Sequence, residues 1–476
     1  MNKRKTFYSI LRSLFLGITV LVIAFLVTRN LIYREEEKKD SIRRIRERGY
    51  IIALTDKNTL NYHIYRGEPM GYQLELLQSF AESLGVPLKI IASNDISKLL
   101  YYLNNNVADL VSLNLPISRD GKKLVHFSTP FGETRLVIVQ RTLSEHKREN
   151  VSRYKRKVTD FTQSDTVYAP GNPFFSSLYH LFYKESGKQV TLIEDPAASQ
   201  EELIIKVAKG EVDYVLCPEN LAMVYRRFYR NIEVSLVVSP LFSYAWGVNH
   251  NSDSLLMRVD SWLGENMSSK ELKKTYINYF GNQRVVSSLR SEYCSITGDR
   301  ISPYDDEIKE YSKWISWDWR LVASLVYEES NFIPGQISSH NASGLMQLMP
   351  ETAAKFGVDS SSSAAQQIAA GVKYIKYLNK QLQEEITNPR ERIYFILAAY
   401  NVGIGRILMA RDKAEEFGKD RNRWNGHVDY YLLHRSKKDP LAKRDSLDSF
   451  QIDYKMEGFV DDIVNRYYHY KNIFPE

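Results

Sequence analysis

Cysteine is scarce in this chain: Cys217 and Cys294 are the two cysteines among 476 residues. Two cysteines exclude a disulfide-rich scaffold and a cysteine-based zinc site, and leave open either one bridge or two unpaired buried thiols. The sequence also has no RNA-binding motif or long Lys/Arg stripe, so its net charge of +7 does not indicate nucleic acid. No metal cluster or nucleotide-binding loop is visible, and we expect no metal and no cofactor.

Long apolar runs are missing as well, except at the N-terminus. Basic residues precede an apolar run over residues 14–27, which reaches the length of a membrane span if it extends to Tyr33. No small-residue cleavage site follows, so residues 1–33 are predicted to be an uncleaved signal anchor, with a cleaved signal peptide as the alternative. Positive charge before the span predicts that the N-terminus lies inside and that the bulk of the chain lies outside, on the periplasmic side of the membrane. Residues 34–45 are predicted to form a charged stalk.

The remaining chain divides into two parts with different patterns. Strand and helix patterns alternate over residues 46–281, which predicts a mostly parallel sheet covered by helices. The expected strands and helices of its first half cover residues 51–54, 72–84, 87–91, 96–103 and 108–113. Residues 282–301 are predicted to be a linker. Residues 302–476 show helical spacing without a clear strand, and predict a small, mainly α domain with helices over residues 317–329, 350–356, 364–383 and 390–400.

One carboxylate in the helical part is aimed at the domain interior. On the helix expected over residues 317–329, Glu329 falls near the centre of the apolar stripe, whereas Glu328 lies at its edge. A carboxyl group against apolar side chains has a raised pKa, as a general acid requires at neutral pH. Periodicity alone also allows a structural Glu329 that pairs with a buried arginine.

Two further motifs support a catalytic role for this glutamate. Gly344 opens the segment Gly-Leu-Met-Gln-Leu-Met-Pro, and Tyr400-Asn401 follows two alanines. In this order and spacing, the three motifs resemble the soluble-lytic-transglycosylase domain. The resemblance covers about residues 302–470 and implies a lysozyme-like, mainly α fold. Members of that family cut the β-1,4 bond between N-acetylmuramic acid and N-acetylglucosamine, and leave a 1,6-anhydromuramic end.

The resemblance implies a role for each matched residue. Glu329 protonates the glycosidic oxygen and then takes the proton of the muramoyl O6 hydroxyl, which attacks C1 in place of water. The expected substrate-binding residues are Ser330, Gly344, Met346, Gln347, Tyr400 and Asn401. The family also carries a Tyr-Val pair near its end, whereas this chain has Phe459-Val460, so a helper hydroxyl is missing unless Tyr454, Tyr467 or Tyr468 supplies it.

The first part resembles the periplasmic solute-binding family for amino acids, which implies two α/β lobes. Its hinges are expected near residues 139–142 and near Pro240. The ligand clamps of the family are lost. Gly121 stands where those proteins place the arginine that binds the ligand carboxylate, with Arg119 two residues away. Pro218 stands in the place of the ammonium-binding aspartate, with Glu219 beside it. A free amino acid is therefore a poor candidate ligand, and a muropeptide or stem peptide, or no ligand, is expected.

The combination of the two parts resembles membrane-bound lytic transglycosylases. It predicts an enzyme that cleaves peptidoglycan strands and whose solute-binding-like domain regulates or targets it. Two alternatives remain open: a non-catalytic receptor for glycan or muropeptide, and a hydrolytic lysozyme. The anchoring membrane, inner or outer, is also left open.

Overall fold

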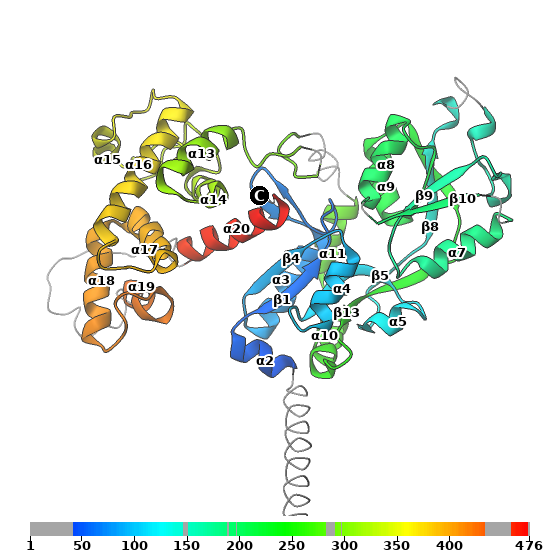
Figure 1. The fold of residues 1–476 in the computed structure, drawn as a ribbon, viewed down its shortest axis with the longest axis horizontal. Helices are drawn as coiled ribbons and strands as arrows, with labels where there is room; N and C mark the ends of the chain where they lie inside the picture. Colours follow the sequence, from blue (N-terminus) through cyan, green and yellow to red (C-terminus); the bar gives the residue numbers. More distant parts are fainter. Residues whose placement is uncertain are drawn as a thin grey trace, which may run out of the picture. The chain divides into compact units, whose positions relative to one another are not determined.

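The fold was described from a computed structural model, in residues 41–145, 151–187, 190–196, 198–281, 291–296, 298–433 and 458–474. The chain divides into two compact units (Figure 1). The first unit contains the described residues up to Asp56 and those between Tyr72 and Asn282. The second contains Lys57–Gly71 together with the described residues after Gln283. The segment 57–71 thus separates from the continuous first domain, 46–281, that the sequence predicts.

The first unit has two lobes, each built on one sheet. The sheet of the first lobe has the order β4-β1-β5-β13-β6, and β7 pairs with β13. Its strands are β1 (Ile51–Thr55), β4 (Leu88–Ala92), β5 (Leu110–Pro116), β6 (His126–Phe127), β7 (Gly132–Thr134) and β13 (Phe242–Val248). The helices of this lobe are α2 (Ser41–Arg48), α3 (Tyr72–Leu84), α4 (Ile96–Asn104), α5 (Gly121–Leu124), α10 (Asp253–Asn266) and α11 (Lys270–Tyr276).

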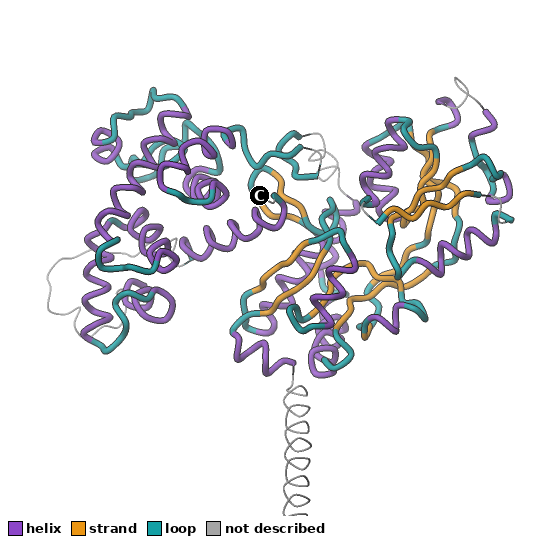
Figure 2. The backbone as a smooth tube through the Cα atoms, in the orientation of Figure 1, coloured by secondary structure: helices purple, strands orange, loops and turns teal. Residues whose placement is uncertain are grey.

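The sheet of the second lobe has the order β10-β9-β11-β8-β12. Its strands are β8 (Leu136–Arg141), β9 (Thr166–Pro170), β10 (Thr191–Asp195), β11 (Tyr214–Pro218) and β12 (Ile232–Val237). Helices α7 (Ser176–Glu185), α8 (Gln200–Lys209) and α9 (Glu219–Phe228) complete the lobe. Figure 2 shows the strands of both lobes surrounded by helices. This confirms a two-lobed α/β domain.

Two expectations about the first unit are wrong: the position of the first crossing between the lobes, and a mostly parallel sheet. The chain leaves the first sheet after β7 and enters the second at β8, so the first crossing lies at Arg135 rather than at residues 139–142, which lie in and just after β8. The return between β12 and β13 includes Pro240, as predicted. The returning strand β13 runs antiparallel to β5, and β8 runs antiparallel to β11. Each sheet is therefore mixed rather than mostly parallel, because the crossing strands enter from the opposite end.

The predicted stalk ends inside the folded domain. Helix α2 buries Ser41 and Ile45, and the Ser41 hydroxyl lies 2.9 Å from that of Ser254 on α10. Residues 41–45 thus belong to the first unit, while the rest of the predicted stalk and the predicted anchor, 1–33, lie outside the described residues. Within the described ranges, no helix has the length and apolar character needed to cross a bilayer.

The second unit begins with a hairpin from the segment 57–71. Strand β2 (His63–Tyr65) pairs antiparallel with β3 (Glu68–Met70). Ser295 donates its backbone N–H to the Ile64 carbonyl, and its hydroxyl accepts the Ile64 N–H at 2.9 Å. The end of the predicted linker 282–301 is therefore packed structure. Cys294 is buried there, Cys217 is buried in β11, and neither forms a disulfide bond.

The rest of the second unit is helical, as predicted. Its helices are α13 (Asp305–Ser312), α14 (Trp319–Ser330), α15 (Pro350–Lys355), α16 (Ala364–Leu382), α17 (Pro389–Val402), α18 (Ile404–Glu416), α19 (Asp429–Leu433) and α20 (Phe459–Ile473). Helix α14 packs against α20, where the Ser324 hydroxyl donates to the Ile463 carbonyl at 2.7 Å. Val322 and Leu325 on α14 are completely buried, which places this helix in the core of the unit.

Candidate active site

Glu329 lies in the last turn of α14. Asp318 precedes the first residue of the helix, and its side chain accepts the Arg320 N–H and so caps the first turn. Asn331 follows the last residue and caps this end in a left-handed conformation with φ 49°. Glu329 therefore stands where a buried helix reaches the surface, and its residue is partly exposed.

The surroundings of Glu329 favour its protonated form. Burial, and then the negative charge of Glu328, raise the pKa of the Glu329 carboxyl to about 8. Among the described residues, no group forms a hydrogen bond to this carboxyl. A carboxylic acid that keeps its proton at neutral pH and remains partly accessible is suited to general acid catalysis.

The two helical neighbours of Glu329 are held by other elements. Arg466 on α20 donates to the Glu328 carboxylate at 2.8 Å, and its guanidinium lies 4.4 Å from the centre of the Tyr327 ring. The Tyr327 hydroxyl donates to Glu68 of the hairpin at 2.6 Å. Glu328 thus forms an ion pair with Arg466, whereas Glu329 has no such partner among the described residues.

Gly344 needs its lack of a side chain. Its φ is +80°, and a Cβ there would lie 2.4 Å from Oε1 of Gln367 on α16. That oxygen accepts the Leu345 N–H at 2.8 Å, and the Gln367 amide donates to the Ser362 carbonyl at 2.8 Å. Gln367 therefore fixes the backbone of the motif, a role that sequence reasoning missed because no local pattern links the two positions.

Ser330 joins helix α14 to the same motif. Its hydroxyl is buried and lies 3.0 Å from the Val326 carbonyl and 2.9 Å from the Leu345 carbonyl. The structure thus places this hydroxyl inside the domain, where it joins α14 to the Gly344 segment, rather than on an open surface.

Tyr400 approaches the motif from α17. Its hydroxyl donates to the Met346 carbonyl at 2.6 Å, and burial and then the charge of Glu329 raise its pKa. Glu329, Met346 and Tyr400 therefore lie in one neighbourhood. The Met346 side chain is buried and packs against Gly371, where a Cβ would meet it at 2.4 Å.

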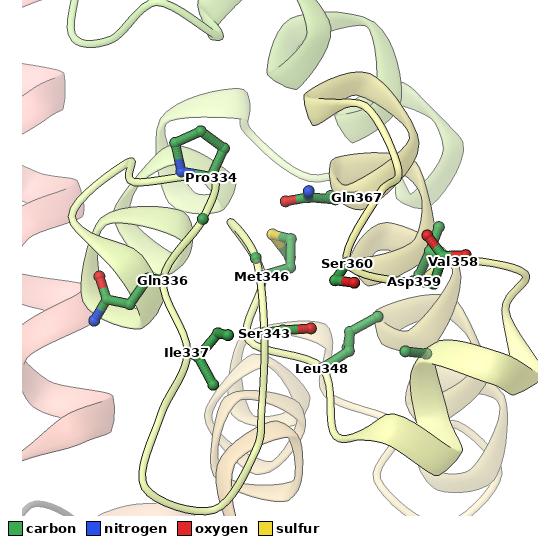
Figure 3. A pocket seen from close by; sticks show the side chains of 13 residues that line it. Pro334, Gln336, Ile337, Ser343, Met346, Leu348, Val358, Asp359, Ser360 and Gln367 are labelled. Carbon is green, nitrogen blue, oxygen red and sulfur yellow. The ribbon is translucent and has the colours of Figure 1, made fainter.

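A pocket of about 160 Å³ lies beside the motif. Gly344, Met346 and Gln367 are among its lining residues, and Figure 3 shows Met346 and Ser343 among the side chains around it. Gln347 is partly buried, and its amide donates to the Gln336 and Gly344 carbonyls at 2.9 and 2.8 Å. These two bonds hold the tight turn of the motif.

Asn401 is exposed and lies at a second, smaller cavity of about 40 Å³. Phe459 and Asp461 also line this cavity. Tyr467, one candidate for the missing hydroxyl, donates to Asp318 at 3.1 Å, and Tyr468 is exposed. Tyr454 lies outside the described residues. Asn401 and Phe459 are thus neighbours, although 58 positions separate them.

The clamp positions of the first unit are occupied in other ways. Gly121 is buried, and a Cβ there would lie 2.8 Å from Phe127 and 2.9 Å from Phe174. Glu219, beside Pro218, accepts two bonds from Arg135 at 2.7 and 2.8 Å. Arg119 is exposed. A larger side chain does not fit at Gly121, and the Glu219 carboxylate already has a cationic partner.

Each of the two predicted parts of the chain matches the model of a known protein family. The model of the Transglycosylase SLT domain matches residues 306–423, and that of bacterial extracellular solute-binding proteins, family 3, matches residues 51–282. A membrane-bound lytic murein transglycosylase F of Pseudomonas fluorescens is 29% identical over 82% of this chain and 78% of its own length. In both of its parts, the chain is similar to the proteins named membrane-bound lytic murein transglycosylase F.

A second protein of that name, from Desulfosudis oleivorans, is 25% identical over 88% of this chain and 90% of its own length. Among solved structures, a mutant of ArgBP from T. maritima matches 51% of this chain and all of its own length, with 21% identity and a TM-score of 0.43. The SLT match contains Glu329 and all the predicted substrate-binding residues, but it ends before α20.

Proposed function

We propose that this transglycosylase F-like chain is a peptidoglycan lytic transglycosylase in which Glu329 is the single acid and base. The observation that carries the proposal is the partly exposed Glu329 carboxyl, whose pKa burial raises to about 8 beside the Gly344 and Tyr400 motifs. Most glycosidases use two carboxylates. Here the neighbouring carboxylate, Glu328, is held in an ion pair with Arg466, which fits a reaction whose nucleophile comes from the substrate.

The reaction uses one carboxyl group twice, first as acid and then as base. The Glu329 carboxylic acid protonates the glycosidic oxygen as the bond from C1 of N-acetylmuramic acid to that oxygen breaks, and N-acetylglucosamine leaves with a free 4-hydroxyl. The muramoyl O6 hydroxyl then attacks C1, and its proton passes to the Glu329 carboxylate. A 1,6-anhydro ring forms, no water is consumed, and the acid is restored for the next cycle.

The test is digestion of purified peptidoglycan by the full chain, with mass spectrometry of the products. The Glu329→Gln variant is expected to release no anhydro-muropeptides, because the amide cannot donate the proton. Glu384→Gln changes an exposed glutamate after α16 in the same way and is expected to retain activity. If the parent chain releases no product, the receptor alternative is favoured, and hydrated muramic ends indicate a lysozyme.

We propose that the first unit takes a muropeptide or stem peptide rather than a free amino acid, and thereby regulates or targets cleavage. The glycine at position 121 and the Arg135–Glu219 pair support the loss of amino-acid binding. Calorimetry with a peptidoglycan stem tripeptide should show binding to the full chain, and equal heats from the tripeptide and from buffer would refute this assignment.

We further propose that residues 1–33 attach the enzyme to a membrane of the cell envelope. The apolar run over residues 14–27 and the basic residues before it support an anchor. The full chain is expected to sediment with membranes, and a chain that begins at residue 34 is expected to remain in the supernatant. Equal amounts of both chains in the supernatant would contradict the proposal.

A further inference from the structure

Tyr327, Glu328 and Glu329 are consecutive residues in the last turns of helix α14, and their side chains have different partners. Tyr327 and Glu328 are each bonded to a side chain of another element, whereas no hydrogen bond to the Glu329 carboxyl exists among the described residues. The position of Glu329 therefore depends on the last turn of the helix, and that turn depends on the partners of its two neighbours.

Arg466 of α20 is the ion-pair partner of Glu328. Its guanidinium forms the ion pair with Glu328 and covers the Tyr327 ring, and its side chain is 14% exposed. A planar guanidinium that bonds a carboxylate and stacks on an aromatic ring restrains both groups at once. Arg466 lies beyond the range that the SLT model matches, so that match assigns it no role.

Glu68 of the hairpin is the hydrogen-bond partner of Tyr327. Its carboxylate accepts the Tyr327 hydroxyl at 2.6 Å, and the Tyr470 hydroxyl of α20 donates to the Gly67 carbonyl at 2.7 Å. Gly67 has φ +85°, and a Cβ there would lie 2.5 Å from Tyr327. The hairpin tip thus fits closely against α14 and α20. Its residues lie within the range of the solute-binding model, yet they pack inside the second unit.

We propose that Arg466 and Glu68 are positioning residues for Glu329, which they hold through Glu328 and Tyr327. This proposal rests on the proposed function, because it concerns the acid of that reaction. It also makes the segment 57–71 a structural part of the catalytic unit, although it is encoded within the solute-binding half of the sequence.

The charges around the turn predict signed effects on the acidity of Glu329. The groups that face it or its neighbours are Glu328 on α14, Arg466 and Asp462 on α20, Glu68 on the hairpin and Tyr400 on α17. Glu328 raises the pKa of Glu329, and Arg466 offsets the charge of Glu328. Loss of Glu328 must lower the pKa of Glu329, and loss of Arg466 must raise it.

The first experiment compares pH profiles of anhydro-muropeptide release by the full chain in detergent. Glu328→Gln should move the alkaline limb down by about half a pH unit or more, and Arg466→Met should move it up. The double variant should lie between the two. A purely structural role would lower the rate of both variants without moving their limbs in opposite directions, and that outcome would overturn the role of Arg466.

The second experiment tests the hairpin. Glu68→Ala removes the acceptor of the Tyr327 hydroxyl and should lower the rate at saturating peptidoglycan about tenfold, since small misplacements of a catalytic group are costly. Glu68→Gln retains an acceptor oxygen and should restore most of the rate. Equal rates for the alanine and glutamine variants would refute the role of Glu68.

An NMR titration of the Glu329 carboxyl carbon in ¹³C-glutamate-labelled full chain separates the two proposals. The signal is assigned by its absence in Glu329→Gln, and its pKa can be measured without turnover. Opposite shifts in Glu328→Gln and Arg466→Met, in a parent chain that releases no product, would support the positioning network and refute the proposed activity. If the parent chain is active and Glu329 titrates at the same pH in the parent and in both variants, the positioning network is refuted and the proposed activity is not.

Discussion

Replacement of Gly344 by alanine tests how the motif beside Glu329 is built. The new Cβ would meet Gln367 Oε1 at 2.4 Å, and the backbone would keep a left-handed φ of +80°. The strained conformation costs about 1 kcal/mol, and displacement of Gln367 leaves the buried Leu345 N–H without its acceptor, which costs about 1 to 3 kcal/mol more. We therefore expect Gly344→Ala to lower the free energy of unfolding of the second unit by about 2 to 4 kcal/mol.

Gly357→Ala is the matched control for this prediction. Gly357 has φ +77°, but nothing lies within 4 Å of a Cβ built there, so the control carries the backbone cost without the clash. It should lose about 1 kcal/mol. The assay is urea denaturation, followed by hydrogen exchange and mass spectrometry of peptides from the second unit. Equal losses in the two variants would show that the Gln367 contact does not stabilise the motif.

Three further predictions follow from single groups. Cleavage should fall about tenfold per pH unit above pH 8, where Glu329 loses its proton, and a rate that stays constant up to pH 10 would contradict its role as the acid. Burial lowers the pKa of His63 to about 4, so the unfolded chain takes up the His63 proton at a higher pH than the folded chain does. The free energy of unfolding should therefore fall by up to about 3 kcal/mol as the pH drops from 6.5 to 4. Acid denaturation of His63→Gln should be less steep than that of the parent, whereas the exposed control His340→Gln should match the parent. Calorimetry of the full chain with free arginine or glutamate should give no binding heat, because Arg135 occupies the Glu219 carboxylate, and tight binding would refute this reasoning.

Local signals placed the helices well. Helix α3 has the predicted bounds, because Gly71 and Gly85 border it with φ values of 153° and 68°. Helix α14 begins two residues later than predicted, at the residue after the Asp318 cap, and ends one residue later, at Ser330. Hydrophobic spacing and capping residues are properties of the neighbouring sequence, so they can be recognised without tertiary information.

Long-range pairing could not be found in this way. The hairpin 57–71 is held by Ser295, Tyr327 and Tyr470, which lie more than 200 positions away along the chain. The Arg466–Glu328 pair joins two helices separated by 138 positions. The antiparallel course of β13 likewise depends on the return of the chain from the second lobe. In each case the partner is chosen by packing, and neither segment alone carries a signal for it.

The sequence located Glu329, the proposed acid, but not the residues that hold its helical turn in place. Helical periodicity placed Glu329 on the inward side of α14, and its raised pKa agrees with that placement. The hydroxyl of Ser330, expected to orient substrate, instead joins α14 to Leu345. Gln367, Arg466 and Glu68 were not identified, because each acts on a residue far from it in sequence.

The measurement that tests the central claim most directly is digestion of peptidoglycan by the full chain in water enriched in ¹⁸O. Attack by the muramoyl O6 hydroxyl incorporates no solvent oxygen, so we predict muramic ends that carry no ¹⁸O and are one water lighter than hydrolysed ends. Muramic ends that gain one ¹⁸O atom would show that water is the nucleophile, and would contradict the assignment of this chain as a lytic transglycosylase.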